Sequence, residues 1–290
     1  MPELPEVETI RLGLQKYLVG HRILAVEVRV AKIFQGDRKN VIGAKVINID
    51  RAGKGLIIEF NNDYVMAIHL KLTGQVIYQR SNIKDQISKR AGGALPNKFT
   101  HVIFKLDKGA FLYYNDLRKF GWIKIVQRSK FKDQSFFKDL GPEPPVISKF
   151  KDQKSKTGLT LDKFREITAK TATPIKIILM DQKKISGIGN IYANEALFLA
   201  GVDPRRSARR ISVKEAKKLY EAILEVLKKA LKYGGSSDVN FVNAIGEDGN
   251  YQNHFLVYSR EREKCRICGC VIEKIKLGGR GTYFCPKCQR

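Results

Sequence analysis

The chain begins Met1-Pro2-Glu3, and its second residue has the chemistry of a nucleophile. Methionine is usually trimmed when the next side chain is small, so we expect Pro2 to become the N-terminus. A fraction of its secondary amine would be unprotonated at neutral pH, because the pKa of an α-amino group is about 8. Such an amine attacks an aldehyde carbon without a dedicated base, and the Glu3 carboxyl can move protons. The resulting iminium favours elimination; the alternative is that Pro2 only shapes an N-terminal arm.

A second chemical signature lies near the C-terminus, where all five cysteines occur. Four of them form two CxxC pairs, Cys265/Cys268 and Cys285/Cys288, which are separated by sixteen residues. Four thiolates at this spacing predict one tetrahedral zinc ion with no open coordination position. The zinc would therefore be structural and would fold a segment too small to hold its own core. Cys270 is left over, and we expect a free thiol.

Three further segments carry residues that suit nucleic acid. The glycines around Arg280 predict a hairpin tip from which the arginine projects, and Lys54 lies in a glycine turn between two strands. A solvated side chain is the alternative for both. In the loop 115–121, Phe120 could enter a base stack while Arg118 faces the orphaned base. The alternative for Phe120 is a ring that anchors the loop to the core.

Three other polar residues are weaker candidates. Asn190 follows Gly187-Ile188-Gly189 between two helical segments, where backbone N–H groups at a helix N-terminus can bind phosphate. By itself this segment also fits an ordinary turn between helices. His69 and His101 lie at strand edges, where a lone histidine more often packs than functions.

The charge balance points to a polyanionic partner. The chain has 54 Lys+Arg against 29 Asp+Glu, a formal net charge of +25 over 290 residues. Nucleic acid is the leading candidate. No apolar run approaches the roughly 18 residues that a membrane-spanning helix needs, and the N-terminus lacks the layout of a signal peptide. We expect a cytoplasmic, nucleoid-associated protein that acts as a monomer.

The first half of the chain predicts a helix on an antiparallel sandwich. Helical spacing of apolar residues runs from Pro5 to about Leu18, and Gly20 can end the helix. The segment Asp107–Gly109 is typical of a hairpin turn, and Ser81–Pro96 is expected to be a mobile loop. The predicted strands are Ile23–Val30, Lys45–Asp50, Leu56–Phe60, Tyr64–Leu70, His101–Leu106, Phe111–Asn115 and Gly121–Gln127.

The second half predicts helices after a break in composition around residues 129–158. Ser212 and Glu215 form a capping box that begins the best-defined helix, and Gly234-Gly235 ends it. Residues 236–255 form a loop that is too long to be a simple connector. The other helical segments are Leu161–Ile167, Pro174–Asp181 and Ala193–Leu199.

These features together resemble the bacterial formamidopyrimidine-DNA glycosylases along the whole chain. The resemblance rests on PELPEVET, RAGK, HLKLTG, NDLRKFG, MDQKKISGIGNIYANEALF and VYSR, followed by the zinc-ribbon spacing. It implies an α+β multidomain fold with an N-terminal helix, an antiparallel β-sandwich, a helix–two-turn–helix domain and a C-terminal zinc-ribbon β-hairpin. The implied divisions are a sandwich domain at 1–130, a linker at 131–158, the helical domain at 159–235, a lesion-proximal loop and connector at 236–260 and the zinc finger at 261–290.

The resemblance also implies an activity and residue roles. The enzyme would excise oxidised purines from double-stranded DNA and cut the strand at the resulting abasic site by β,δ-elimination. Pro2 would form the Schiff base, Glu3 would donate and accept protons, and Glu6 would order the site. Lys54 and Arg280 would grip phosphate and assist elimination. The implied DNA contacts are His69, Leu72, His101, Arg118, Phe120 and Asn190.

Two departures from the family pattern affect the choice of lesion. The usual HLGM is His69-Leu70-Lys71-Leu72 in this chain, and the usual Asp-Pro is Asp116-Leu117. The related endonuclease VIII group, which prefers oxidised pyrimidines, also uses leucine nearby, so it is the alternative within the class. A non-catalytic zinc-ribbon DNA-binding protein is the alternative from another class.

Overall fold

The structure, a computed structural model, describes residues 1–80, 87–146 and 158–290, which form two compact units. The first unit comprises Met1–Lys138 and Leu231–Gln252, and the second comprises Asp139–Ala230 and Asn253–Arg290. This grouping is coarser than the five divisions predicted above, whose bounds stay a prediction. It arises because the loop after residue 231 bonds to the N-terminal helix, while the cysteine-rich segment packs on the helices of the second unit.

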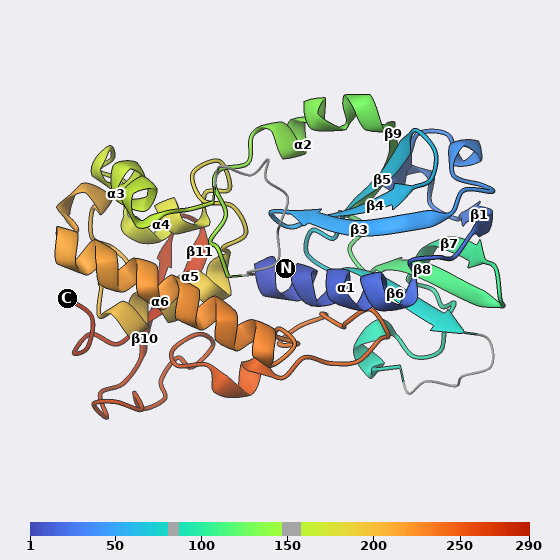
Figure 1. The fold of residues 1–290 in the computed structure, drawn as a ribbon. Coiled ribbons are helices and arrows are strands. Elements are labelled where there is room, and N and C mark those ends of the chain that lie inside the picture. Colours follow the sequence, from blue (N-terminus) through green and yellow to red (C-terminus); the bar gives the residue numbers. More distant parts are fainter. Residues whose placement is uncertain (81–86, 147–157) are drawn as a thin grey trace. The chain divides into compact units, whose positions relative to one another are not determined.

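The main elements of the first unit are helix α1 (Leu4–Tyr17) and two β-sheets (Figure 1). Neighbouring strands are antiparallel, except that β2 runs parallel to β9. The four-stranded sheet has the order β1 (Ile23–Val28), β7 (Thr100–Leu106), β8 (Ala110–Asp116), β6 (Gly74–Arg80). The five-stranded sheet has the order β2 (Phe34–Gln35), β9 (Trp122–Gln127), β5 (Tyr64–His69), β4 (Gly55–Phe60), β3 (Val46–Ala52).

Apolar residues of α1 and of both sheets fill one core. Val7, Ile10 and Leu14 repeat at helical spacing and are fully buried against the strands. At the far end of β7 and β8, the Asp107–Gly109 turn is confirmed, since Ala110 N–H bonds to Asp107 C=O at 3.3 Å. Burial of these side chains is the main stabilising contribution to the unit.

Two parts of the first unit differ from expectation. Strand β6 was not predicted, because glycine and glutamine at its start hide the alternation of Val76 and Tyr78, which point into the core. The expected mobile loop Ser81–Pro96 is only partly described, and its described part is anchored to the rest of the first unit. Helix η3 (Lys89–Ala91) lies there, and Ala91 is buried against Ile77.

The predicted linker also begins as part of the sandwich. Helices η4 (Arg128–Asp133) and α2 (Ser135–Lys138) follow β9, and the ring of Phe136 lies so close to Gly55 that a Cβ there would be 2.9 Å away. Two further short helices, η1 (Ala31–Ile33) and η2 (Arg38–Asn40), lie between β1 and β3.

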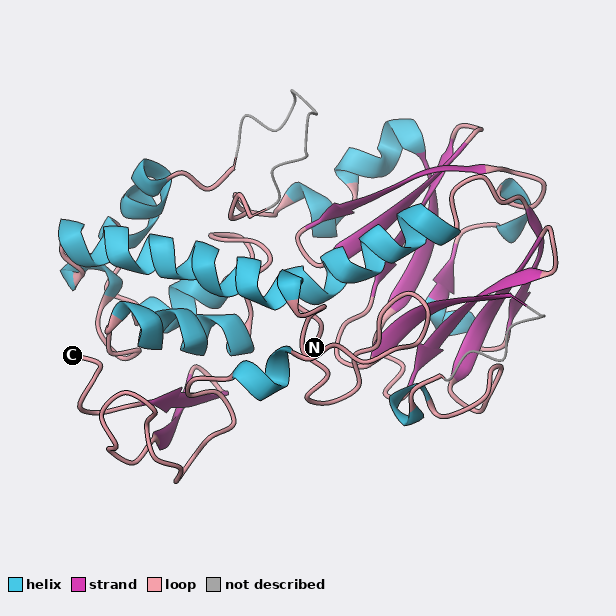
Figure 2. Ribbon diagram, turned by 60° about the horizontal axis from the view of Figure 1, so that its bottom comes forward, coloured by secondary structure: helices cyan, strands magenta, loops and turns pink. Residues whose placement is uncertain are grey.

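The second unit contains the predicted helices and a two-stranded hairpin (Figure 2). Helix α5 begins at Asn190, earlier than predicted, because Gly189 serves as its N-cap. The hairpin pairs β10 with β11. The elements are α3 (Leu161–Ala169), α4 (Ile175–Met180), α5 (Asn190–Ala200), η5 (Ala208–Arg210), α6 (Val213–Lys232), η6 (Tyr251–His254), β10 (Glu273–Leu277) and β11 (Arg280–Phe284); α6 and η6 cross the unit boundaries.

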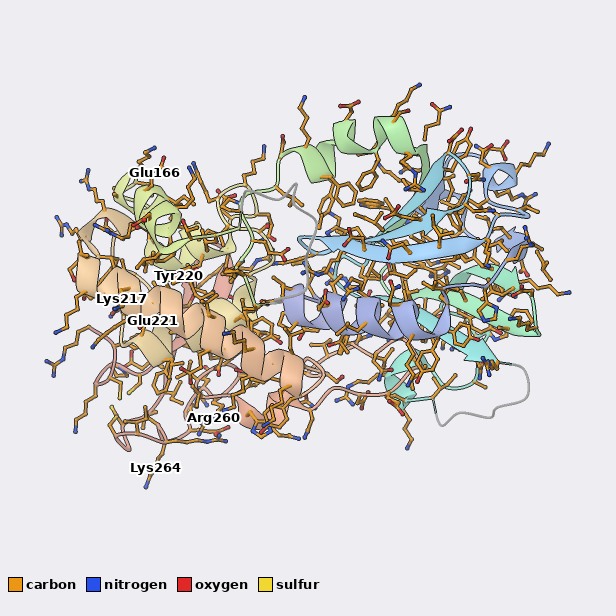
Figure 3. The ribbon with its side chains drawn as sticks, viewed as in Figure 1. Glu166, Lys217, Tyr220, Glu221, Arg260 and Lys264 are labelled. Carbon is orange, nitrogen blue, oxygen red and sulfur yellow. The ribbon has the colours of Figure 1, made fainter. Side chains whose placement is uncertain are left out.

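The start of helix α6 agrees with the capping box predicted from the sequence. The capping box is confirmed, since Ser212 N–H donates to Glu215 Oε2 at 2.8 Å and Glu215 N–H to Ser212 Oγ at 3.3 Å. Tyr220, labelled in Figure 3, bonds through its hydroxyl to Leu159 C=O at 2.8 Å. Lys217 and Glu221 pair at 4.0 Å on the exposed side. Within the described residues, no helix combines the length and apolar character needed to cross a membrane.

Candidate active site and metal centre

The carboxylate of Glu6 holds the N-terminus of α1. Its Oε2 accepts a hydrogen bond from Glu3 N–H at 2.8 Å, and its Oε1 accepts one from Ser236 N–H at 2.8 Å. Gly235 permits this approach, since its φ is +81° and a Cβ there would lie 3.0 Å from Glu6 Oε1. The first turn of α1 and the loop after α6 therefore form one corner, and Pro2 and Glu3 are buried in it.

The chain's α-amino group lies among several ionisable side chains. Burial lowers the pKa of the Met1 amine below its usual value. The negative charges of Glu3, Glu6 and Asp238 oppose this effect, and the positive charge of Lys54 adds to it. Glu3, Glu6 and Lys54 thus lie near the N-terminal amine, and their catalytic roles stay a prediction.

Strand register brings further predicted residues to one end of the sandwich. Gly55 pairs with His69, so the turn 53–54 and the loop 70–73 leave their strands at the same end. The loop 117–121 leads into β9, whose first residue also pairs with His69. The predicted residues at this end are Lys54, His69, Leu72, Arg118 and Phe120.

A buried ion pair supports the turn that carries Lys54. The Arg51 guanidinium donates from Nε to Glu8 Oε2 at 2.9 Å and from Nη1 to Gly53 C=O at 2.8 Å. Both ionised side chains have no solvent exposure. Lys54 itself is only 3% exposed. The alternative of a solvated turn lysine is therefore wrong, because a buried ammonium is kept only where its surroundings compensate its lost hydration.

His69 is buried and electrically neutral. Its Nδ1 accepts a hydrogen bond from Lys71 N–H at 2.9 Å, and its ring meets that of Phe136 edge-on, with centroids 4.5 Å apart. Burial, followed by the charges of Lys71 and Lys54, lowers the pKa of His69 to about 3. The ring proton of the neutral imidazole must then lie on Nε2, which is a donor.

Asp116 organises the loop that carries Arg118. This fully buried carboxylate accepts hydrogen bonds from the Thr73 hydroxyl at 2.5 Å, from Arg118 N–H at 3.2 Å and from Gly121 N–H at 2.8 Å. The backbone C=O of Asp116 accepts a hydrogen bond from His101 Nε2 at 2.7 Å. His101 therefore supports the loop from within, and its predicted DNA contact stays a prediction.

The tip of this loop is exposed and carries two apolar and two basic side chains. Phe120 is 54% exposed, and the Arg118 guanidinium lies 4.8 Å from the centre of its ring. The alternative of a ring that anchors the loop in the core is therefore wrong. Leu117 is also exposed, whereas Leu72 is half-buried in the neighbouring loop. An exposed aromatic ring beside an arginine suits insertion between bases.

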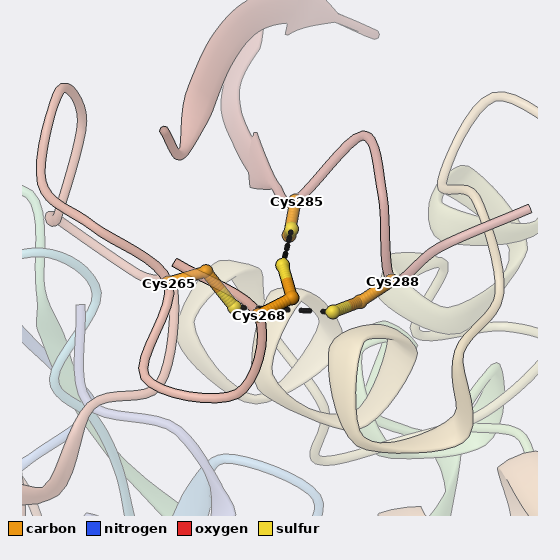
Figure 4. A group of neighbouring side chains, drawn as sticks. All are labelled: Cys265, Cys268, Cys285 and Cys288. Carbon is orange, nitrogen blue, oxygen red and sulfur yellow. Dashed lines mark hydrogen bonds between the residues drawn. The ribbon is translucent and has the colours of Figure 1, made fainter. Parts of the chain in front are cut away.

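The four predicted metal ligands converge in the second unit (Figure 4). The Sγ atoms of Cys265, Cys268, Cys285 and Cys288 lie within 4.8 Å of one another. The Cys268–Cys285 and Cys265–Cys288 sulfur separations are 3.4 Å and 3.9 Å. Tetrahedral zinc with bonds of about 2.3 Å requires sulfur atoms roughly 3.8 Å apart. The donor set and its dimensions therefore fit one closed, structural zinc ion.

The hairpin next to the metal ligands presents Arg280, which is exposed. Lys176, only 1% exposed, donates to Gly281 C=O at 2.9 Å and to the Thr282 hydroxyl at 2.7 Å. The Asn190 amide also donates to Gly281 C=O, at 3.0 Å. Two helices thus hold the residue directly after Arg280. This brings Asn190 and Arg280 together, while a DNA contact of Asn190 stays a prediction.

Sequence reasoning missed several residues that hold the site together. Lys176 stands in the apolar run Pro174–Met180, and a charge in such a run is itself a sign of a buried, paired group. Asp116, Arg51 and Ser236 carry no comparable signal, because each has a partner that is far away in the sequence.

Three family models match the chain in succession. They are the formamidopyrimidine-DNA glycosylase N-terminal domain at residues 1–123, the formamidopyrimidine-DNA glycosylase H2TH domain at residues 140–241 and the zinc finger found in FPG and IleRS at residues 262–290. The chain belongs to the formamidopyrimidine-DNA glycosylase family. The resemblance of its sequence and the predicted fold class are thereby confirmed, and so is the structural zinc, since the zinc-finger match covers all four cysteines.

Individual relatives agree with this assignment to the family. The chain is 37% identical to the formamidopyrimidine-DNA glycosylase of Streptococcus mutans and 38% identical to that of Lactiplantibacillus plantarum, in each case over 100% of both chains. Among solved structures, it is similar to a Lactococcus lactis FPG mutant in complex with Fapy-dG-containing DNA. That match has a TM-score of 0.86, with 33% identity and coverage of 100% of both chains.

Proposed function

We propose that this glycosylase is a bifunctional enzyme of base excision repair, which removes oxidised purines from double-stranded DNA and then cleaves the abasic site. The observation that carries the proposal is the corner at the start of α1. There the chain's amine, Glu3 and Glu6 lie together with the buried Lys54. The net charge of +25 supports a nucleic-acid substrate.

In the proposed reaction, removal of Met1 frees the secondary amine of Pro2. Its lone pair forms a bond to C1′ of the damaged nucleoside as the C1′–base bond breaks, and the departing base takes up a proton. Opening of the sugar then gives an iminium on Pro2. Loss of a C2′ proton breaks the C3′–O bond, and in the second elimination loss of a C4′ proton breaks the C5′–O bond. Water finally releases the sugar fragment.

The surrounding residues have distinct roles in this proposal. Glu3 donates and accepts the protons at the sugar, and Glu6 keeps Glu3 in place through its backbone N–H. Lys54 assists the first elimination and Arg280 the second, and each neutralises a phosphate. The base must leave the duplex first, at a cost of a few kcal/mol. We propose that Leu72, Arg118 and Phe120 fill the gap that it leaves.

Oxidised purines are the proposed lesions because of Arg118. Its guanidinium can donate paired hydrogen bonds to the acceptor edge of cytosine, the partner of guanine lesions. Lactococcus lactis Fpg has been solved in complex with Fapy-dG-containing DNA and also with oxidised-pyrimidine-containing DNA. An endonuclease VIII-like preference for pyrimidines is thus the alternative to test. With chromosomal DNA as substrate, we propose a cytoplasmic, nucleoid-associated location.

Borohydride trapping tests the chemistry. Incubation with borohydride and duplexes carrying an oxidised purine, an oxidised pyrimidine or an abasic site should cross-link the enzyme to DNA through its N-terminal peptide. Pro2→Gly should reduce the cross-link strongly, and Glu3→Gln should lose base excision while retaining DNA binding. Full trapping on an internal lysine, or an active enzyme that retains Met1, would overturn the proposal.

The rival of a non-catalytic zinc-ribbon DNA-binding protein makes the opposite prediction. It would bind duplexes without forming a trapped adduct, and a tag ahead of Pro2 would leave it unharmed. In the proposed enzyme such a tag abolishes trapping.

A further inference from the structure

Lys71 has a backbone conformation that lysine rarely adopts. It lies two residues after His69, at the end of the sandwich where the predicted site residues gather, and its φ is +51°. Glycine adopts this left-handed region freely, whereas a side chain there costs stability because its Cβ crowds the following carbonyl. Strain of this kind persists where the surrounding structure enforces it, and it is common at functional sites.

The backbone of Lys71 has a clear use, but its side chain does not serve that use. The Lys71 N–H donates to His69 Nδ1 at 2.9 Å, which orients the imidazole. The edge-on ring of Phe136 and the tilted ring of Trp122 hold the imidazole from other directions. A glycine at position 71 would offer the same N–H without the strain. The lysine side chain therefore needs another explanation.

The charges around His69 explain why a lysine side chain would be useful at position 71. Lys54 comes just before Gly55, the strand partner of His69, so Lys54 and Lys71 extend from the same end of β4 and β5. Both ammonium groups are close enough for their charges to lower the pKa of His69. The imidazole stays neutral at pH 7, so it offers one N–H donor and no charge. Two cations beside one neutral donor are a suitable set for a phosphate group.

We propose that Lys71 is a DNA-backbone ligand that binds a phosphate together with His69 and Lys54. This inference rests on the proposed function, because it takes DNA as the substrate. It adds a contact made by a side chain whose position would otherwise favour glycine. The Lys71 ammonium contributes binding of any sequence, and it leaves the bond-breaking chemistry to the N-terminal corner.

The test is the salt dependence of binding by the Lys71→Gly variant. The probe is a duplex with a tetrahydrofuran abasic analogue, which the enzyme cannot cleave. Its dissociation constant is measured at salt concentrations between about 50 and 200 mM, a range over which binding through phosphate contacts weakens strongly. Lys71→Gly should reduce the magnitude of the negative slope of log association constant against log salt concentration by about 0.9. Lys71→Arg should retain the slope. Lys71→Gly should also raise Tm by about 2 °C through relief of strain.

Lys108 provides a matched control. It also has a left-handed backbone, with φ +57°, and it lies in the hairpin turn at the opposite end of β7 and β8. Two strands of seven residues separate that turn from the site end by about 20 Å. Lys108→Gly removes the same charge and the same kind of strain, so it should raise Tm similarly and leave the slope unchanged.

The outcomes separate this inference from the proposed function. An unchanged slope in Lys71→Gly, or an equal fall in Lys108→Gly, would overturn the role of Lys71 even if Pro2 is trapped normally by borohydride. Failure of the unmodified enzyme to be trapped would instead overturn the proposed chemistry. Even then, a salt dependence that is weaker in Lys71→Gly but unchanged in Lys108→Gly would support a phosphate contact of Lys71.

Discussion

Glu6 and Ser236 are joined by a hydrogen bond of 2.8 Å from the Ser236 N–H to the carboxylate, although 230 positions separate them in the sequence. The other oxygen of the same carboxylate accepts the N–H of Glu3. One buried side chain therefore fixes both the start of α1 and the loop that follows α6. The proposed nucleophile and its neighbouring acid depend on this connection for their position.

Replacing Glu6 with glutamine should disturb both stability and chemistry. The amide keeps one acceptor oxygen, and its NH2 group faces one of the two backbone donors. A buried donor without an acceptor costs about 1–3 kcal/mol. Glu6→Gln should lower the free energy of unfolding in urea by that amount and slow borohydride trapping. The exposed Glu225→Gln on α6 should change stability by less than about 0.5 kcal/mol. Equal unfolding free energies and equal trapping rates in the two variants would show that Glu6 does not hold the N-terminal corner in place.

Gly235→Ala should be more damaging than an alanine at another left-handed glycine. At Gly235 the added Cβ would meet Glu6 Oε1 at 3.0 Å, whereas at Gly20, with φ +94°, no heavy atom lies within 4 Å. The conformational cost of about 1–2 kcal/mol is common to both. Urea unfolding should therefore show a larger loss for Gly235→Ala, and only that variant should slow trapping. A loss of activity in Gly20→Ala would point to a different cause.

His69 should make the folded state sensitive to mild acid. Its pKa falls from 6.5 to about 3 on folding, so below pH 6.5 the unfolded chain binds a proton that the folded chain does not. Stability from this group is complete above pH 6.5 and is lost as the pH falls toward 3. Between pH 7 and pH 5 the wild-type free energy of unfolding should fall by up to about 2 kcal/mol more than that of His69→Gln. Identical pH profiles would show that His69 is not neutral in the folded protein.

Zinc should be needed for DNA binding and not for folding of the sandwich. Cys285→Ser removes one of four ligands next to the hairpin that carries Arg280, so the hairpin should lose its order. We expect loss of bound zinc and of duplex binding, with the β-sheet circular dichroism signal retained. Cys270→Ser should leave the zinc content unchanged, since Cys270 lies outside the four-sulfur group. Normal DNA cleavage by zinc-free protein would contradict this role.

Variants of Phe120 and Arg118 should affect removal of the damaged base from the duplex more than strand cleavage. Phe120→Ala removes the exposed ring, so excision of a damaged base from duplex should slow by at least tenfold, while cleavage at a preformed abasic site should change much less. Arg118→Ala should flatten the preference for the base opposite the lesion. Excision rates with all four opposite bases measure this directly. An unchanged ranking would assign Arg118 to a phosphate contact.

Features that depend on neighbours in the sequence were predictable. The CxxC spacing identified the zinc ligands, and the capping box located the start of α6, because the two cysteines of each pair, like Ser212 and Glu215, are only three residues apart. Runs rich in β-branched and aromatic residues identified most strands. This signal failed at β6, where polar residues interrupt the pattern and packing against the core decides the structure instead.

The sequence alone determined the family, the zinc site and the identity of the candidate residues, while the tertiary structure decided which charged residues are buried. Lys54 and Lys108 both lie in tight turns beside glycine, and local pattern treats them alike. Lys108 is exposed, whereas Lys54 is buried near the N-terminal amine. The difference arises because burial depends on segments that are distant in the sequence, here α1 and the aromatic residues after β9, and only folding brings these against the turn.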